Sequence, residues 1–370
     1  MRKKILEMCP YMNLGGTEKH LLTLAKELAG RFELVIVAPR GPARGDFENY
    51  GFQMVDYPEA LSISPRKTVT VIKQVESLIQ KERPHLVHVH AAREMLAMVR
   101  LVDRAIPLVF TPHAYTSSFD FVTTSLFTRL ADRVICVSDW EKIRLDKFLG
   151  ARAGTLTVRI YNGIPMPGGP DAEIPARAPC GRPPDSITLG CVARLHKAKG
   201  IDVLIRAFAG LLPECPGLEL VIVGDGQERE GMERLASKLG VRCRVRFTGG
   251  LARPMEEVKN WDIFVLPSFK ETLSIAIIEA MSLGKPVIST TVGGIPEVVQ
   301  HGQTGLLCRP GDVSQLKEAI RTLVRSPGMR AGFGEKARER ARELFSASRM
   351  AEMTAGVYEE TIAMREACSH

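Results

Sequence analysis

Aromatic residues are scarce in this chain, at 6% of its 370 residues, and they do not alternate with its basic residues. Single-stranded nucleic acids are held by aromatic side chains set among basic ones, so nucleic acid is not an expected partner. The eight cysteines are scattered and include no C-x-x-C pair, so neither a zinc site nor a disulfide framework is indicated.

Long apolar runs and several familiar motifs are also missing. No window approaches eighteen consecutive apolar residues, and the opening MRKKILEMCP leads into a strand-like run rather than a signal sequence. These absences predict a cytoplasmic protein. The sequence contains no P-loop, no well-placed G-x-G-x-x-G and no G-x-S-x-G, which removes the basis for NTPase, dinucleotide-binding and serine-hydrolase interpretations.

The net charge is +8, from 50 basic and 42 acidic residues, and most of the excess lies in the first 162 residues. A basic half fits an anionic partner such as an acidic membrane surface or a phosphorylated acceptor. Solubility alone accounts for the same charge equally well. A peripheral contact with the inner face of the cytoplasmic membrane is therefore one of two open interpretations.

Short Val- and Ile-rich runs alternate with amphipathic stretches through both halves of the chain, which predicts α/β domains with buried parallel strands. A proline-rich segment without apolar periodicity separates the halves. We expect two doubly wound, Rossmann-like domains facing across a cleft at the carboxyl ends of their strands. The expected parts are an N-terminal acceptor-binding domain (1–165), a linker (166–185), a C-terminal nucleotide-sugar domain (186–346) and a last helix that packs back on the first domain (347–370).

The strongest local signal is KETLSIAIIEAMSLGKPVIST, which follows a predicted strand. Glu271 falls in the turn after that strand, and Glu279 falls within the helix that comes next. Both carboxylates are therefore expected at the strand-end cleft. The helix start at Ser274 and Ile275 offers free backbone N–H groups, which suit a phosphate or a sugar hydroxyl.

Two further strand-to-helix loops carry phosphate-binding chemistry. Arg194 and Lys199 in GCVARLHKAKGID can neutralise a diphosphate without a metal, although one of them could equally be a solvated residue at a helix start. Gly15 and Gly16 precede the first helix, where a glycine pair lets backbone approach a phosphate. Glycine also serves ordinary turns, so this second signal is weak.

Histidines near predicted strand ends are the remaining candidates. His113 in VFTPHAY is expected at the cleft, with a structural role as the equal alternative. His88 and His90 share one face of a strand, but no third ligand with suitable spacing accompanies them, so we expect a structural role. Asp225 lies between two glycines and is expected to form a turn.

Taken together, these strings resemble the retaining glycosyltransferases of family four (group 1), which have the GT-B fold. The resemblance covers nearly the whole chain in the order of the family's motifs. The segments that carry it are NLGGTEKHLLTLAKEL, TPHA, ADRVICVSDWEK, YNGIP, VARLHKAKGID, LVIVGDG, VRFTGGL, DIFVLPS, ETLSIAIIEA and TTVGGIPEVVQHGQTGLL.

The resemblance implies roles for individual residues. Arg194 and Lys199 would bind the diphosphate of a nucleotide sugar, with Gly16 of the first loop contributing its amide. Glu279 would bind the ribose, and His113 would contact the transferred hexose. Glu271 would hold the sugar together with the backbone of the next four residues. The donor-binding residues implied in addition are Thr272, Leu273, Ser274, Ile275, and Gly249 to Arg253 around the base.

The activity implied is transfer of a hexose or N-acetylhexosamine from a UDP- or GDP-linked sugar to a glycan or lipid-linked acceptor. The reaction would need no metal or cofactor and would retain the anomeric configuration. It would serve lipopolysaccharide or polysaccharide biosynthesis. Arg194, Lys199, Glu271 and His113 would be the catalytic residues. A UDP-sugar 2-epimerase of the same architecture and a catalytically silent GT-B binding protein are the alternatives. The epimerase needs its own acid and base groups across the cleft, and its motifs are not recognised here. Acceptor specificity is expected in the loops 40–49 and 115–120.

Overall fold

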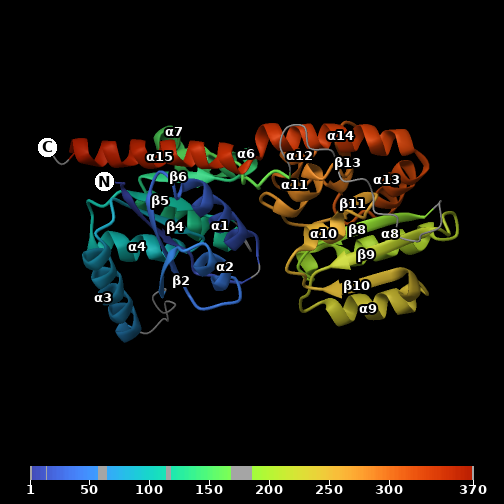
Figure 1. Cartoon of the computed structure of the whole chain (residues 1–370), viewed down its shortest axis with the longest axis horizontal. Helices are drawn as coiled ribbons and strands as arrows, with labels where there is room; N and C mark the ends of the chain where they lie inside the picture. The colour runs from blue at the N-terminus through green and yellow to red at the C-terminus, as the bar shows by residue number, and fades with distance from the viewer. Residues whose placement is uncertain (1, 14, 57–64, 114–117, 168–185, 369–370) are drawn as a thin grey trace. The chain divides into compact units, whose positions relative to one another are not determined.

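The computed structural model describes residues 2–13, 15–56, 65–113, 118–167 and 186–368 (Figure 1). Most of the expected linker, residues 168–185, and residues 115–117 of one expected acceptor loop lie outside these ranges. The chain forms two compact units, one made of residues 1–165 with 347–370 and the other of residues 166–346. Each unit is an α/β domain around one parallel sheet.

The first unit holds a parallel sheet of seven strands in the order β3-β2-β1-β4-β5-β6-β7. Its strands are β1 (Lys4–Met8), β2 (Glu33–Ala38), β3 (Gln53–Asp56), β4 (Leu86–His90), β5 (Leu108–Thr111), β6 (Arg133–Cys136) and β7 (Thr157–Arg159). Its helices are α1 (Gly16–Leu28), α2 (Arg44–Asn49), α3 (Pro65–Glu82), α4 (Arg93–Val102), α5 (Ser118–Phe127), α6 (Asp139–Leu149), α7 (Ala153–Leu156) and α15 (Ala347–Cys368).

The second unit holds six parallel strands in the order β10-β9-β8-β11-β12-β13. Its strands are β8 (Ile187–Val192), β9 (Leu218–Val223), β10 (Val245–Gly249), β11 (Ile263–Leu266), β12 (Val287–Thr290) and β13 (Gly305–Cys308). Its helices are α8 (Ile201–Leu211), α9 (Arg229–Lys238), α10 (Pro254–Val258), α11 (Ile275–Ser282), α12 (Ile295–Val298), α13 (Val313–Arg325) and α14 (Pro327–Leu344).

Both faces of the first sheet are covered, which explains why its strands read as continuous apolar runs rather than alternating ones. Ile5 packs into a core with α1 and α15, whereas its neighbour Leu6 packs on the opposite face with α3, α4 and α6. Successive side chains of a strand point to opposite faces of the sheet. Because helices cover both faces, both residues are fully buried. The two expected Rossmann-like domains are thereby confirmed as α/β units.

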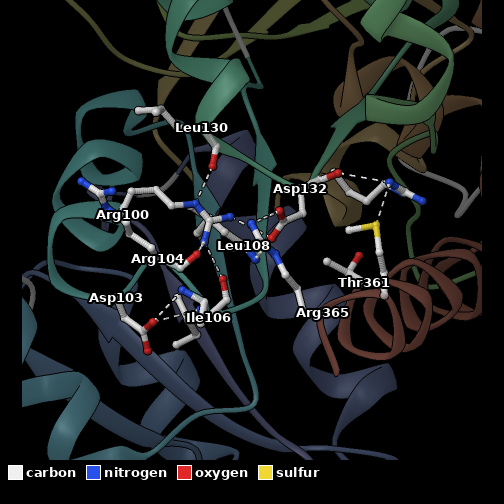
Figure 2. Close-up of polar contacts among 12 residues, drawn as sticks. Arg100, Asp103, Arg104, Ile106, Leu108, Leu130, Asp132, Thr361 and Arg365 are labelled. Atoms are coloured by element: carbon white, nitrogen blue, oxygen red, sulfur yellow. Dashed lines mark hydrogen bonds and ion pairs between the residues drawn. The ribbon is translucent and has the colours of Figure 1, made fainter. Parts of the chain in front are cut away.

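The last helix, α15, belongs to the first unit although it ends the chain. Tyr358 is fully buried against α1 and the sheet. Nearer the end of the helix, Arg365 forms an ion pair with Asp132, which also accepts hydrogen bonds from the Arg100 guanidinium (2.8 Å) and the Leu108 amide (2.9 Å) (Figure 2). This aspartate therefore ties α15 to α4 and β5.

Some local expectations need correction. The apolar run TLTVRI at 155–160 suggests one strand, but α7 occupies residues up to Leu156 and β7 begins only at Thr157. Short helix α2 lies within the expected acceptor loop 40–49. Among the described residues, no helix combines the length and hydropathy needed to cross a membrane.

Candidate functional site

The loops with the candidate donor-binding residues meet at the carboxyl edge of the second sheet. Strands β8 and β11 are neighbours in the middle of the sheet. The strands that follow β8 in the chain extend the sheet to one side, and those that follow β11 extend it to the other. Such a switch point opens a crevice outside the strand ends in doubly wound folds. Arg194 and Lys199 follow β8, and Glu271 follows β11, so the two strongest sequence signals lie on either side of this point.

Lys199 and Glu271 form an ion pair across the switch point, with 2.6 Å between Nζ and Oε2. Their side chains are 25% and 13% exposed, so the pair is held at the surface of the unit rather than in its core. Arg194 lies on the same loop with an exposed side chain that contacts no described residue through a hydrogen bond or ion pair. The structure thus gathers two cations and one carboxylate at this edge.

Close backbone packing fixes the loop that carries Glu271. The Ala198 carbonyl accepts a hydrogen bond from the Phe269 amide at 2.8 Å, and the Thr272 carbonyl accepts one from the Gly294 amide at 3.0 Å. Gly293 has φ of +56°, and a Cβ there would lie 1.5 Å from the Glu271 carbonyl oxygen. Only glycine satisfies both demands at this position, which gives the first glycine of TTVGGIPE a structural reason.

Helix α11 presents its N-terminus beside this pair. Ser274 caps it by accepting a hydrogen bond from the Ile277 amide at 3.4 Å. Of the residues that the structure describes, none accepts a hydrogen bond from the amides of Leu273, Ser274 or Ile275. Free amides at a helix N-terminus attract anions. Glu279 lies one turn into the helix and is half-buried.

The adjoining loops after β9 and β10 are joined to the Arg194 loop by backbone hydrogen bonds. The Gly224 amide donates to the Gly249 carbonyl, and the Leu195 amide donates to the Asp225 carbonyl, both at 2.8 Å. Asp225 also accepts a hydrogen bond from the Gly226 amide at 2.8 Å, as expected for a turn residue. Arg253 lies at the exposed start of α10.

In the first unit, the corresponding switch point lies between β1 and β4. Gly15 is the N-cap of α1 and Gly16 its first residue, so this glycine pair does form a strand-to-helix turn. His113 follows β5 with φ of +68°, a left-handed conformation that is uncommon outside glycine. His113, Gly15 and Gly16 therefore belong to the unit that does not contain Arg194, Lys199 and Glu271.

No third ligand was visible in the sequence beside His88 and His90, but the folded chain brings other titratable side chains to them. Glu7, His88 and His90 place possible ligand atoms within 4.8 Å of one another, and so do His20, His90 and His113. Glu7 and His88 face each other in the register of β1 and β4. Sequence spacing could not reveal this, because the two strands are separated by five other elements in the chain.

Burial and neighbouring side chains shift the pKa of several members of this cluster. Burial lowers the pKa of His20 to about 3 and that of His88 to about 4, and it holds the pKa of His113 well below the ordinary range. Burial alone would raise the pKa of Glu7, but the neighbouring His88 and His90 outweigh it and keep that pKa far below its usual value. At neutral pH, Glu7 is a carboxylate among imidazoles.

Comparison with known proteins agrees with this double α/β arrangement. A model of the glycosyltransferase family 4 matches residues 14–166, and a model of the glycosyl transferases group 1 matches residues 175–340. The glycogen synthase of Mycobacterium tuberculosis is 30% identical over 293 residues, which are 75% of this chain and 69% of that enzyme. The chain belongs to the group 1, family 4 glycosyltransferases.

Two further matches are one curated relative and one solved structure. The N-acetyl-alpha-D-glucosaminyl L-malate synthase of Bacillus anthracis is 33% identical over 171 residues, which are 46% of this chain and 45% of that enzyme. The match thus spans less than half the length of this relative. Anabaena HepE, solved in complex with UDP and glucose, has the same fold, with a TM-score of 0.82 and 23% identity over 97% of this chain and 100% of HepE.

Proposed function

We propose that this protein is a retaining, metal-independent glycosyltransferase. It would move a hexose or N-acetylhexosamine from a UDP- or GDP-linked sugar to a cell-envelope glycan or lipid-linked acceptor. The observation that carries the proposal is the Lys199–Glu271 ion pair beside the free amides of α11, at the switch point of the second unit. Membership of the group 1 family supports a transferase over the epimerase alternative.

Departure of a nucleoside diphosphate builds negative charge on the bridging phosphate oxygen, so catalysis needs positive groups placed there in advance. Lys199 would supply one such charge, and its ion pair with Glu271 holds the ammonium group in place before donor binds. Arg194 and the amides of Leu273 to Ile275 would add to it. Glu271 would also hold the sugar ring, and Glu279 the ribose, as the family resemblance implies.

In the first unit, His113 would contact the transferred sugar, and the Gly15–Gly16 turn would offer an amide to the donor phosphate. The base would lie near Gly249 to Arg253. HepE was solved with UDP and glucose, which supports a UDP-linked hexose as the first donor to test. The basic first half of the chain supports an acceptor presented at an anionic membrane surface, with the enzyme on its cytoplasmic side.

The test is thermal stabilisation by UDP, GDP, ADP and their sugar conjugates, with EDTA present throughout. A ligand that binds the folded protein at a hundredfold excess over its Kd stabilises by about 2.7 kcal/mol, which shifts Tm measurably. We expect one nucleotide to act selectively and the shift to vanish in Lys199→Ala. Lys197→Ala is the matched control, because Lys197 is an exposed lysine of the same loop and should keep the full shift.

Turnover distinguishes the transferase from a silent binding protein. With the donor found above, release of the nucleoside diphosphate and the anomeric configuration of the product are measured, the second by proton NMR. We expect release in EDTA and a product with the donor's configuration. Binding without turnover on a panel of glycan and lipid-linked acceptors would favour the silent protein, and an epimerised donor would favour the epimerase.

A further inference from the structure

A continuous hydrogen-bonded chain runs through the first unit from Glu7 to His113. Nε2 of His90 lies 2.8 Å from Oε2 of Glu7, and Nδ1 of the same ring lies 3.0 Å from Nε2 of His113. Glu7 and His90 are fully buried, whereas His113 is only partly buried. The chain therefore begins in the core of the unit and ends at a residue that solvent can reach.

Glu7 is itself held in one orientation from its other side. The Tyr358 hydroxyl of α15 donates a hydrogen bond to its Oε1 at 2.7 Å, and Nδ1 of His88 lies 3.2 Å from its Oε2. His88 in turn has Thr111 as a partner of its Nε2 at 2.8 Å. A buried carboxylate costs free energy unless such partners surround it, and here they fix its position.

The chemistry of the chain determines which ring nitrogens carry protons. A carboxylate only accepts hydrogen bonds, so Nε2 of His90 must donate to Glu7. With that proton on Nε2, His90 presents a lone pair at Nδ1, and His113 donates to it from Nε2. Nδ1 of His113 is thereby left as an acceptor, ready for a sugar hydroxyl. The carboxylate selects the tautomer of a ring that it does not touch.

The backbone conformation of His113 explains why its imidazole ring needs contacts that hold it in place. With φ of +68°, the residue adopts a conformation that costs free energy for a side chain of this size. The hydrogen bond to His90 and the packing of its ring edge against His20, at 4.7 Å between centroids, hold the imidazole in that position. Without His90, the described partners of the ring would provide packing but no tautomer selection.

We infer that Glu7 and His90 are positioning residues that fix the orientation and tautomer of His113 for its contact with the transferred sugar. This inference rests on the proposed function, in which His113 meets the donor sugar. It adds that the ring is supported by two buried residues from β1 and β4 that never reach the substrate. The same geometry explains why β4 ends with a fully buried histidine.

The first test reads the tautomers directly in the unmodified protein. Nitrogen-15 NMR of histidine-labelled enzyme at neutral pH distinguishes protonated from unprotonated ring nitrogens. Signals are assigned with His90→Asn and His113→Ala. We expect His90 and His113 each to be a single neutral tautomer protonated on Nε2. A mixture of both tautomers at His113 in the unmodified protein would overturn the inference.

The second test compares the kinetics of Glu7→Gln, His90→Asn and His113→Ala with those of the matched control Thr111→Val. Thr111→Val removes a buried hydrogen bond to His88 and leaves the His90–His113 contact in place. A displaced contact group costs about 10²-fold in rate, so we expect that loss of kcat in Glu7→Gln and His90→Asn with donor KM little changed. Thr111→Val should retain kcat and lose only stability.

The outcomes separate the two proposals. If His113→Ala itself keeps kcat, the proposed role of His113 fails, whatever its neighbours do. If His113→Ala loses kcat while folded His90→Asn and Glu7→Gln keep it, the positioning role fails alone. One equivalent of zinc in protein purified without chelator, lost with EDTA together with activity, would also overturn the inference, because His90 Nδ1 would then bind metal instead of His113.

Discussion

Both units place polar groups at a switch point of their sheet, but they hold these groups in different ways. In the second unit, Lys199 and Glu271 remain partly exposed, and backbone contacts hold their loops. In the first unit, Glu7, His88 and His90 are fully buried, and side chains hold one another. The first arrangement keeps charge available for a phosphate, whereas the second keeps His88 neutral and holds the buried side chains in one orientation. Each therefore responds to a different perturbation.

The largest effect is expected where charge is exposed for catalysis. Lys199→Ala should lower kcat/KM about 10³-fold, because one preorganised charge that stabilises a transition state contributes on this scale. The folded state should persist, since the ion pair lies at the surface and contributes at most about 1 kcal/mol. Steady-state kinetics and circular dichroism of Lys199→Ala beside Lys197→Ala check both statements. A rate within threefold of the unmodified enzyme would contradict the site assignment.

The backbone support of the second unit is tested by Gly293→Ala. Its Cβ would lie 1.5 Å from the Glu271 carbonyl, so the loop must move, and we expect a loss of about 3 kcal/mol in the free energy of unfolding. Gly302→Ala is the matched control, with φ of +76° and no atom within 4 Å of the added Cβ. It should cost only about 1 kcal/mol. Equal losses in urea titrations would show that packing under Glu271 is unimportant.

How much of this follows from sequence differs between the units. In the second unit, Arg194, Lys199 and Glu271 lie in two short sequence segments. Each segment follows a short apolar run, which is sufficient to place these residues at strand ends. The hydrogen-bonded chain that ends at His113 joins residues from β1, from β4 and from the segment after β5, and α15 supports it through Tyr358. Their proximity depends on strand order and register, which the spacing of single residues does not contain.

Acidification sharpens the comparison. Burial lowers the pKa of His20 and His88 to about 3 and 4, so these groups stay neutral in the folded protein, whereas in the unfolded chain they take up protons below about pH 6.5. The unfolded state then binds more protons than the folded state. The free energy of unfolding therefore decreases as the pH is lowered from about 6.5 to about 4. Each histidine contributes a slope of about 1.4 kcal/mol per pH unit. The histidines described in the second unit, His196 and His301, are exposed.

The chain carries two tryptophans, and they report on the units separately. Trp140 lies on α6 of the first unit, and Trp261 is buried in the second. Urea titrations of Trp261→Phe and Trp140→Phe therefore follow one unit each by fluorescence. When the pH is lowered from 7 to 5, we expect the urea midpoint reported by Trp140 to decrease much more than the urea midpoint reported by Trp261. Parallel shifts in both variants would mean that the buried histidines do not set the acid sensitivity.

The smallest effect is expected at Arg194, whose exposed guanidinium contacts no described residue through a hydrogen bond or ion pair. Its contribution begins only when a diphosphate binds, so Arg194→Ala should leave the free energy of unfolding within about 0.5 kcal/mol of its original value. The dissociation constant of the nucleoside diphosphate should rise about tenfold, a loss near 1.4 kcal/mol. Because the charge is solvated, this difference should shrink as salt is raised. Titration calorimetry at two salt concentrations measures it, with Arg206→Ala as the exposed control on α8. An unchanged dissociation constant at low salt would leave Lys199 and the amides of α11 as the groups that hold the diphosphate.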